Sequence, residues 1–279
     1  MSPEAIGHRA MAANLSDIAA MGARPVLATV ALGLDPRTTA PDWVVACYLA
    51  MAGLAARFSA AIVGGDLVRA PTLTLSLTVV GEVSPRRMRL RDGARPYDVL
   101  AITGPTGASR AGLELLKRPL ALDPPNAEAA RNAFLFPEPR LREGRFLGAS
   151  RAVHAMMDCT DGLSTDVARL VQAAGYGATL LGPPIDPAAE AVALAAGDDP
   201  AAYGLDGGED FELIVAVAPR AFPHLARRFE RHFGRPLIGF GSVDPEPGLR
   251  LAGPQGPLPL APAGWDSLIS PERPRAARG

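Results

Sequence analysis

The stretch V-H-A-M-M-D-C-T-D-G-L-S-T-D at 153–166 is the clearest indication of how this chain folds. Its first half is apolar and has strand character, and its second half has the spacing of a helix. Asp158, Asp161 and Asp166 therefore fall where a buried strand passes into a helix N-terminus. A helix-capping role for Thr160 or Asp161 explains one polar residue. It does not explain Asp158, whose carboxylate would be desolvated unless it met a cation or several donors.

Three other segments place acids where a strand or helix ends: N-L-S-D at 14–17, V-G-G-D at 63–66 and D-G-G-E-D at 206–210. Asp17 alone could be a solvated helix residue, but the helix dipole disfavours an acid near a helix C-terminus. G-G-D alone is a common turn. Mg²⁺ prefers carboxylate ligands, which it commonly shares with substrate phosphates. The four segments together predict a site for hard cations and phosphate.

Length and composition indicate a two-domain globular protein. The chain has 279 residues, more than a usual single domain, and a basic stretch at 86–96 suggests a boundary near Asp92. We therefore expect an N-terminal domain at 1–92 and a C-terminal domain at 93–279. Hydrophobic residues at 48% and charged residues at 20% exclude a disordered chain. The net charge of -1 gives no reason to expect nucleic acid as a partner.

The chain carries no sign of a membrane or secreted protein. No apolar run is long enough to span a bilayer, and the N-terminus lacks the basic and apolar regions of a signal peptide. We therefore expect a cytoplasmic protein without a membrane partner. Cys47 and Cys159 are far apart and neither belongs to a C-x-x-C pair, which argues against a disulfide framework and a structural zinc site.

Strand and helix patterns alternate along the chain. The segment T-L-T-L-S-L-T-V-V at 72–80 alternates most regularly, as a half-exposed strand does. The patterns predict helices at 3–21, 41–58, from about 109, at 162–174 and at 219–233, and strands at 26–34, 60–63, 72–80, 98–104, 153–158, 212–217 and 236–243. Such alternation indicates an α/β protein, more specifically α+β because hairpin-like strands adjoin near the end.

The motifs favour phosphoryl transfer over covalent catalysis. The turn T-G-P-T-G-A-S-R-A-G at 103–112 follows a strand and opens a helix, which is the geometry of an anion site, but it lacks the P-loop lysine. No G-x-S-x-G elbow supplies a nucleophile. Phosphoryl transfer needs mainly positioning and charge neutralisation by metal ions, so we expect no covalent catalytic residue.

Five segments resemble the thiamine-monophosphate kinase family of the aminoimidazole-ribonucleotide-synthetase-like superfamily. They are A-N-L-S-D-I-A-A-M-G-A at 13–23, I-V-G-G-D at 62–66, D-C-T-D-G-L at 158–163, G-G-E-D-F-E-L at 207–213 and G-W-D at 264–266. The resemblance implies a two-domain PurM-like fold and a homodimer formed by the strand-rich N-terminal domains. It also implies ATP-dependent, Mg²⁺-assisted phosphorylation of thiamine phosphate to thiamine diphosphate by direct in-line transfer.

The resemblance assigns three sets of residues by motif position. The metal-binding acids are Asp17, Asp66, Asp158 and Asp161, the ATP contacts are Gly65, Arg91 and Thr160, and the thiamine-phosphate contacts are Glu209 and Trp265. Arg91 suits phosphate through its charge and fork geometry. Trp265 offers a face to a heteroaromatic cation. The alternative for Trp265 is a C-terminal residue that packs on the core.

The chain also departs from the family pattern. The family begins with a further segment that carries G-D-D and T-D acids and a substrate-binding His, so we expect either a misplaced start or a degenerate paralogue. Leu67 stands where the family has Thr, and Ala108 where it has an acid. Two alternatives to the kinase are another ATP-using enzyme of the superfamily and a non-catalytic nucleotide- or thiamine-phosphate-binding protein. Selenophosphate-synthetase and hydrogenase-maturation types need reactive cysteines in positions where this chain has none.

Overall fold

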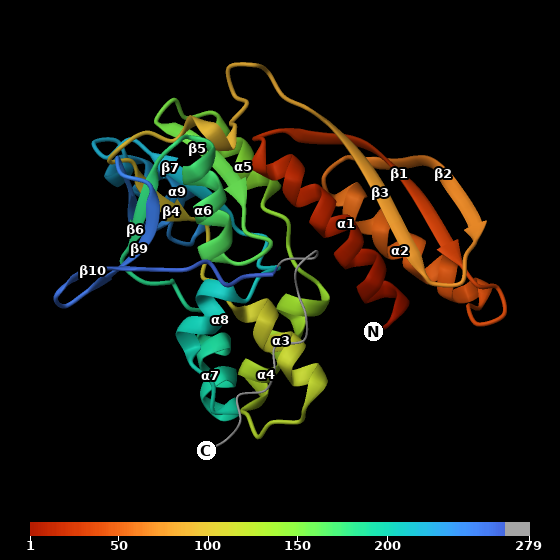
Figure 1. The fold of residues 1–279 in the computed structure, drawn as a ribbon. Coiled ribbons are helices and arrows are strands. Elements are labelled where there is room, and N and C mark those ends of the chain that lie inside the picture. The colour runs from red at the N-terminus through yellow and green to blue at the C-terminus, as the bar shows by residue number, and fades with distance from the viewer. Residues whose placement is uncertain (266–279) are drawn as a thin grey trace.

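The computed structural model describes residues 1–265 and contains two β-sheets with helices packed on them (Figure 1). The three-stranded sheet has the order β2-β1-β3, and the seven-stranded sheet has the order β10-β9-β6-β8-β4-β7-β5. The strands are β1 (Arg24–Leu34), β2 (Ala61–Arg69), β3 (Thr74–Glu82), β4 (Val99–Ile102), β5 (Val153–Asp158), β6 (Gly177–Leu180), β7 (Leu213–Val217), β8 (Ile238–Asp244), β9 (Gly248–Gly253) and β10 (Gly256–Pro259). The helices are α1 (Pro3–Ala20), α2 (Pro41–Arg57), α3 (Ala108–Lys117), α4 (Pro124–Leu135), α5 (Leu141–Gly148), α6 (Leu163–Ala173), α7 (Pro187–Ala196), α8 (Pro200–Asp206) and α9 (Phe222–Phe233).

The first sheet is built around β1, which pairs in parallel with β2 and antiparallel with β3. The alternation expected at 72–80 is confirmed in β3: Leu75, Leu77 and Val79 are half-buried, and the residues between them are exposed. The half-buried residues pack against a core to which α1 and α2 contribute. This side of the sheet is therefore covered by the two helices.

Strand β2 differs from the expectation. The sequence predicted a short strand at 60–63 that ends in a G-G-D turn, but β2 continues through Asp66 to Arg69, with Asp66 opposite Ala31 of β1. Parallel pairing with β1 holds the segment extended. A Cβ at Gly65 would lie 1.8 Å from the Val30 carbonyl oxygen, and the residue has φ +154°, so close strand packing requires glycine here. The turn prediction was wrong because local residue preference does not report strand pairing.

Helix α1 lies between the two sheets (Figure 1). It begins where Ser2 accepts a hydrogen bond from the Ala5 N–H at 3.2 Å and Pro3 occupies the first turn. Met11 and Leu15 of this helix are fully buried in a cluster that also includes residues of β1, β5, β7 and α9. One continuous apolar core therefore joins the helix to both sheets.

The second sheet is mixed and mainly antiparallel, since among residues 1–265 only β6 and β9 pair in parallel within it. Strand β7 is buried along its whole length between β4 and β5. Helices α3, α4, α7 and α8 form a separate small core beside this sheet. This arrangement confirms the α+β prediction. In the described chain, no helix combines the length and apolar character needed to cross a membrane.

Candidate active site

A cavity of about 630 Å³ lies between α1 and β5 and contains two of the predicted metal ligands and one predicted ATP contact. Asp17 comes from the last turn of α1, Asp158 ends β5, and Arg91 opens the short 3₁₀ turn Arg91–Gly93. The other lining residues are Ala20, Met21, Leu90, Asp92, Met156, Met157 and Ala173. Three acidic residues, Asp17, Asp92 and Asp158, thus line a shared, partly apolar space together with Arg91.

Burial controls the electrostatics of Asp158, which is 7% exposed. Burial raises the pKa of Asp158 to about 6, the Ser16 hydroxyl opposes the rise, and the Asp17 carboxylate adds to it. Burial also raises the pKa of Asp17. Among residues 1–265, neither Asp158 Oδ2 nor Ser16 Oγ has a partner with normal hydrogen-bond geometry. A buried carboxylate oxygen that has no well-aligned donor is free to bind a cation.

The loop after β5 is held by Asp166, the fully buried third acid of the opening stretch. Asp166 Oδ2 accepts hydrogen bonds from the backbone N–H groups of Thr160 at 2.8 Å and Asp161 at 2.9 Å. The Arg169 guanidinium bonds both Asp161 Oδ2 and Asp166 Oδ1. Gly162 occupies the N-cap position of α6 without a side-chain hydrogen bond, so neither Thr160 nor Asp161 is the cap.

Glu209 lies in a strained turn beside the same loop. Glu209 and Phe211 have positive φ values of 57° and 51°, which are costly for residues other than glycine. The Glu209 N–H donates to the Thr160 carbonyl at 2.7 Å, which ties this turn to the loop after β5. Arg9 of α1 pairs with Glu209 Oε1 at 2.5 Å and also bonds the Phe134 carbonyl. Glu209 is therefore held from both sides.

Asp210 already occupies the helix N-terminus that the sequence marked as an anion site. Its Oδ1 accepts from the Gly107 N–H at 2.9 Å, directly before α3 begins at Ala108. Burial raises the pKa of Asp210 well above the usual range. The nearby Glu212 is 3% exposed and is bound by Arg140 at 2.5 Å. The T-G-x-x-G turn thus binds a carboxylate of the protein itself.

Trp265 lies next to the loop after β5 with its side chain in solvent. Its N–H donates to the Asp161 carbonyl at 2.8 Å, and the Gly264 N–H donates to Thr165 Oγ1 at 3.0 Å. The residue is 61% exposed, so the alternative of a side chain packed on the core is wrong. Asp266, the last residue of the G-W-D segment, lies outside the described residues.

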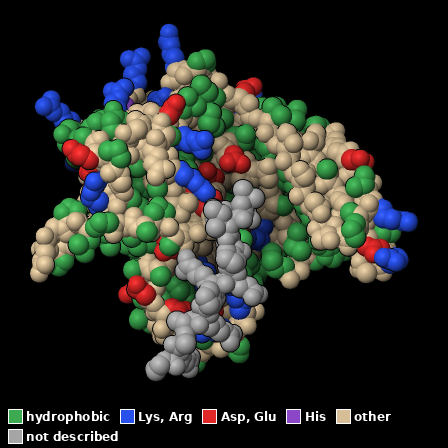
Figure 2. All heavy atoms as spheres, in the orientation of Figure 1, with side chains coloured by type: hydrophobic (Ala, Val, Ile, Leu, Met, Phe, Trp, Pro, Cys, Tyr) green, Lys and Arg blue, Asp and Glu red, His purple; other side chains and the backbone are tan. Residues whose placement is uncertain are grey.

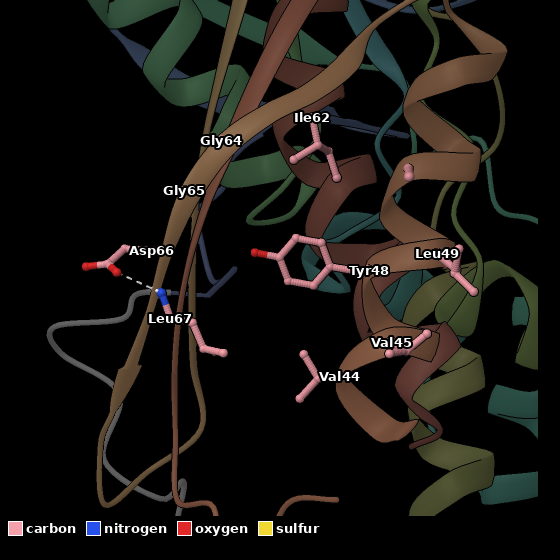
Figure 3. A pocket seen from close by; sticks show the side chains of 10 residues that line it. Val44, Val45, Tyr48, Leu49, Ile62, Gly64, Gly65, Asp66 and Leu67 are labelled. Carbon is pink, nitrogen blue, oxygen red and sulfur yellow. Dashed lines mark hydrogen bonds between the residues drawn. The ribbon is translucent and has the colours of Figure 1, made fainter. Parts of the chain in front are cut away.

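Gly65 and Asp66 lie apart from these groups, in a second pocket of about 800 Å³ formed by α2 and β2 (Figure 3). Leu67 points toward Tyr48 of α2, whereas the Asp66 carboxylate points to the other side of the strand and accepts the Leu67 N–H at 2.9 Å. Neither residue lines the cavity of Asp17 and Asp158. The metal role of Asp66 and the ATP role of Gly65 stay predictions.

The structure thus gathers most of the predicted residues into neighbouring groups, without a finished metal cage. Within residues 1–265, no three His, Cys, Asp or Glu side chains are arranged to hold a metal ion. Sequence reasoning missed Arg9 and Arg169, the two arginines that bind Glu209 and Asp161. Neither belongs to a recognisable motif. Arg9 meets Glu209 only through the tertiary fold. Arg169, in contrast, lies on the helix predicted at 162–174, close in sequence to Asp161.

Comparison with known families defines the class of this fold and site. The model for the N-terminal domain of AIR synthase related proteins matches residues 1–83, and the model for their C-terminal domain matches residues 95–233. The chain belongs to this class of two-domain proteins. Its two sheets correspond in order to the two domains.

Within that class, the chain belongs to the thiamine-monophosphate kinase family. It is 31% identical over 278 residues to the thiamine-monophosphate kinase of Escherichia coli K12, which covers 97% of this chain and 82% of the relative. It is 37% identical over 222 residues to that of Synechococcus elongatus, which covers 78% of this chain and 66% of the relative. The match thus spans just under two thirds of the Synechococcus protein.

Solved structures of the same family share the fold. The thiamine-monophosphate kinase of Stenotrophomonas maltophilia K279a superposes with a TM-score of 0.82 at 31% identity, over 91% of this chain and 80% of that one. A structure of AaThiL complexed with AMPPCP and TMP has a TM-score of 0.82 at 27% identity, over 95% and 81%. The hydrogenase maturation protein HypE of E. coli, at 22% identity and a TM-score of 0.76 over 95% and 81%, shares the fold alone.

Proposed function

We propose that this protein phosphorylates thiamine phosphate to thiamine diphosphate with ATP. The observation that carries the proposal is the cavity that Asp17, Asp158 and Arg91 line together. Relatives named thiamine-monophosphate kinase and the complex of AaThiL with AMPPCP and TMP support it, because AMPPCP is an ATP analogue. The proposal therefore rests on this chain's own geometry as well as on its family.

The reaction we propose is a direct in-line transfer. An oxygen of the thiamine phosphate attacks the γ-phosphorus of ATP, a new P–O bond forms, and the bond to the β,γ-bridging oxygen breaks to release ADP. The attacking oxygen is already anionic near neutral pH, so no strong general base is needed. Arg91 would bind an ATP phosphate by charge and bidentate hydrogen bonding. Its position in the same cavity as Asp17 and Asp158 supports this role.

The cavity fits Mg²⁺. Among the described residues, the buried Asp158 Oδ2 has no partner with normal hydrogen-bond geometry, and Asp17 lines the same cavity. Carboxylates are ligands that Mg²⁺ commonly shares with substrate phosphates. Asp17 and Asp158 would hold the ion, with Asp161 and Asp66 as further predicted ligands. Bound Mg²⁺ would screen the two polyanionic substrates from each other.

The acceptor, thiamine phosphate, would bind on the side of the loop after β5 that lies away from the cavity of Asp17 and Asp158. Glu209 would contact thiamine phosphate, and the exposed Trp265 ring offers a face for its cationic heterocycle. Thr160 is fixed in this loop, because its N–H donates to Asp166 and its carbonyl accepts the Glu209 N–H. With Thr160 as an ATP contact, the phosphate donor and the acceptor would bind on the two sides of this loop.

We also propose a homodimer that forms through the first domain. Val45 and Leu49 of α2 and Val63 and Leu67 of β2 are 56–67% exposed, although all four are apolar. Figure 2 shows basic and acidic side chains at the outer end of this domain. A second copy would cover the apolar side chains. We place the protein in the cytoplasm, where ATP is supplied.

One assay tests the kinase. The purified chain is incubated with ATP, Mg²⁺ and thiamine phosphate, and both thiamine diphosphate and ADP are measured. We expect the two products in equal amounts, and we expect Asp158→Asn to abolish both while leaving the fold intact by circular dichroism. Saturable binding of ATP and thiamine phosphate without product would instead support the second candidate, a non-catalytic binding protein. That candidate is favoured by the position of Asp66 outside the cavity.

A further inference from the structure

Arg169 forms ion pairs with both Asp161 and Asp166, and the reaction proposed above gives this arginine no role. The residue lies on α6, and its Nη1 bonds Asp161 Oδ2 and, at 3.1 Å, Asp166 Oδ1. The Arg169 and Asp161 side chains are 42% and 29% exposed, whereas that of Asp166 is fully buried. The arginine therefore reaches from a fixed, buried acid to a solvent-facing one.

The three residues differ in how firmly they are held. Asp166 is fixed by its hydrogen bonds from the backbone N–H groups of Thr160 and Asp161. The main chain of Asp161 is held by two hydrogen bonds: its N–H donates to Asp166, and its carbonyl accepts the Trp265 N–H. Its side chain, in contrast, is held by the guanidinium. Replacement of the guanidinium by another cation therefore requires no change in the loop.

We propose that Arg169 is a resident counterion of Asp161 that competes with the divalent cation and so sets the metal affinity of the site. The inference rests on the proposed metal role of Asp161. A cation that approaches either carboxylate oxygen meets the positive charge of the guanidinium. The ion must separate the pair or bind more weakly beside it. When the pair separates, Arg169 stays attached to Asp166, so the loop keeps its shape.

The size of the effect follows from the exposure of the pair. Solvent screens an ion pair at this level of exposure, and such a pair contributes little free energy. Its loss should therefore strengthen divalent-cation binding by about two- to fivefold, a range that follows from the energies of exposed ion pairs. The effect should also shrink at high salt, since salt screens the guanidinium as it screens any exposed charge.

The test is a Mn²⁺ titration without nucleotide, followed by the electron paramagnetic resonance of free Mn²⁺. Arg169→Gln removes the charge, and Arg37→Gln is the matched control, because Arg37 forms an exposed ion pair with Asp35, which is not a predicted metal ligand. We expect tighter Mn²⁺ binding in Arg169→Gln and wild-type binding in Arg37→Gln. Asp161→Asn in the Arg169→Gln background should cancel the gain. Equal Mn²⁺ affinity in Arg169→Gln and wild type, or no binding in either, would overturn the proposal.

A second measurement needs no variant that loses the charge. In wild-type protein with ¹⁵N-labelled arginine, added Mg²⁺ should shift the guanidinium signal of Arg169, assigned through Arg169→Lys, and leave that of Arg37 unchanged. An unmoved Arg169 signal at saturating Mg²⁺ argues against the exchange. Both measurements are made without turnover. A chain that makes no thiamine diphosphate therefore fails the proposed function while the metal titrations still decide the role of Arg169.

Discussion

The backbone N–H of Trp265 donates a hydrogen bond to the carbonyl oxygen of Asp161 at 2.8 Å. This bond connects a predicted acceptor contact to a predicted metal ligand through the main chain alone. The indole is left 61% exposed beside the loop. A large aromatic side chain that is fastened at its backbone and free at its ring is suited to bind a ligand rather than to fill a core.

Trp265→Ala should therefore weaken acceptor binding without destabilising the fold. Loss of a cation–π contact is expected to raise the KM for thiamine phosphate by about 2- to 30-fold. The KM for ATP should not change. The free energy of unfolding should stay within about 0.5 kcal/mol of wild type, because the side chain is mostly exposed. Steady-state kinetics and urea unfolding check these values, and a large loss of stability would favour a structural role for the ring.

Asp158→Asn should stabilise the metal-free protein at neutral pH. The raised pKa means that folded Asp158 binds its proton more tightly than unfolded Asp158, so stability falls between the unfolded pKa of 3.8 and the folded pKa of about 6 and stays lower above it. The cost is absent below pH 4 and grows as the pH rises to 6. Urea unfolding in EDTA should show a gain of about 1–3 kcal/mol at pH 7.5. The gain should be smaller at pH 4.5.

Asp35→Asn is the control of opposite sign for that experiment. Hydrogen bonds from Arg37 lower the pKa of Asp35, so its ionised form favours folding and the substitution should not stabilise at pH 7.5. Addition of Mg²⁺ with ATP should stabilise wild type but not Asp158→Asn. If Asp158→Asn gives the same gain in stability at pH 4.5 and pH 7.5, packing and not ionisation accounts for the effect.

Arg91→Gln should act on the nucleotide. A hydrogen-bonded charge that contacts a phosphate contributes about 1.5–3 kcal/mol, which corresponds to a rise of about 10- to 100-fold in the KM for ATP. Arg91→Lys keeps the charge but loses the fork, so its effect should be intermediate. The KM for thiamine phosphate should be unaffected in both variants. A change confined to thiamine phosphate would move Arg91 to the acceptor side.

Leu49→Glu should weaken the homodimer. The residue is 67% exposed on α2, and a glutamate there would bury a charge in the proposed interface. Light scattering at micromolar concentration should show a monomer. Leu258→Glu is the matched control, because Leu258 is 63% exposed on β10 of the other sheet. A dimer that persists in Leu49→Glu and dissociates in Leu258→Glu would place the interface on the second domain.

Arg9→Gln should impair acceptor binding more than nucleotide binding. The arginine fixes Glu209 at 2.5 Å and lies 3.9 Å from the centre of the Phe134 ring. Without it, the strained turn keeps its backbone bond to Thr160 but loses the orientation of the Glu209 carboxylate. We expect a rise of about 3- to 30-fold in the KM for thiamine phosphate. Arg24→Gln, which breaks an exposed pair with Glu82, is a control that should leave both KM values unchanged.

Sequence patterns predicted the elements whose burial follows one local period. Helix α1, the alternating strand β3 and the passage from β5 to α6 lie where the patterns indicated. Helices α4, α7 and α8 were missed although their starts carry a readable signal. Each begins with an aspartate that accepts a backbone N–H, followed directly by proline: Asp123, Asp186 and Asp199. Attention to this pair of residues would have found all three.

Other features depend on pairing between distant parts of the chain. The continuation of β2 through Gly65 follows from its register with β1, which no local pattern reports. The motifs identified Asp17 and Asp158 separately, and only the fold shows that they share a cavity with Arg91. The arginines on Glu209 and Asp161 could not be assigned, because arginine is common on surfaces and its partner is chosen by tertiary structure. The domain boundary near Asp92 stays a prediction.

Helix α1 contributes to both sides of the site, with Arg9 on Glu209 and Asp17 in the metal cavity. The two residues are eight positions apart, which corresponds to about 12 Å along the helix axis. The length of helix between Arg9 and Asp17 therefore sets the distance between the acceptor side and the metal side of the site. One inserted residue would turn its two ends by about 100° relative to each other. Many substitutions in α1 would leave this spacing unchanged. An insertion or deletion between Arg9 and Asp17 would alter it.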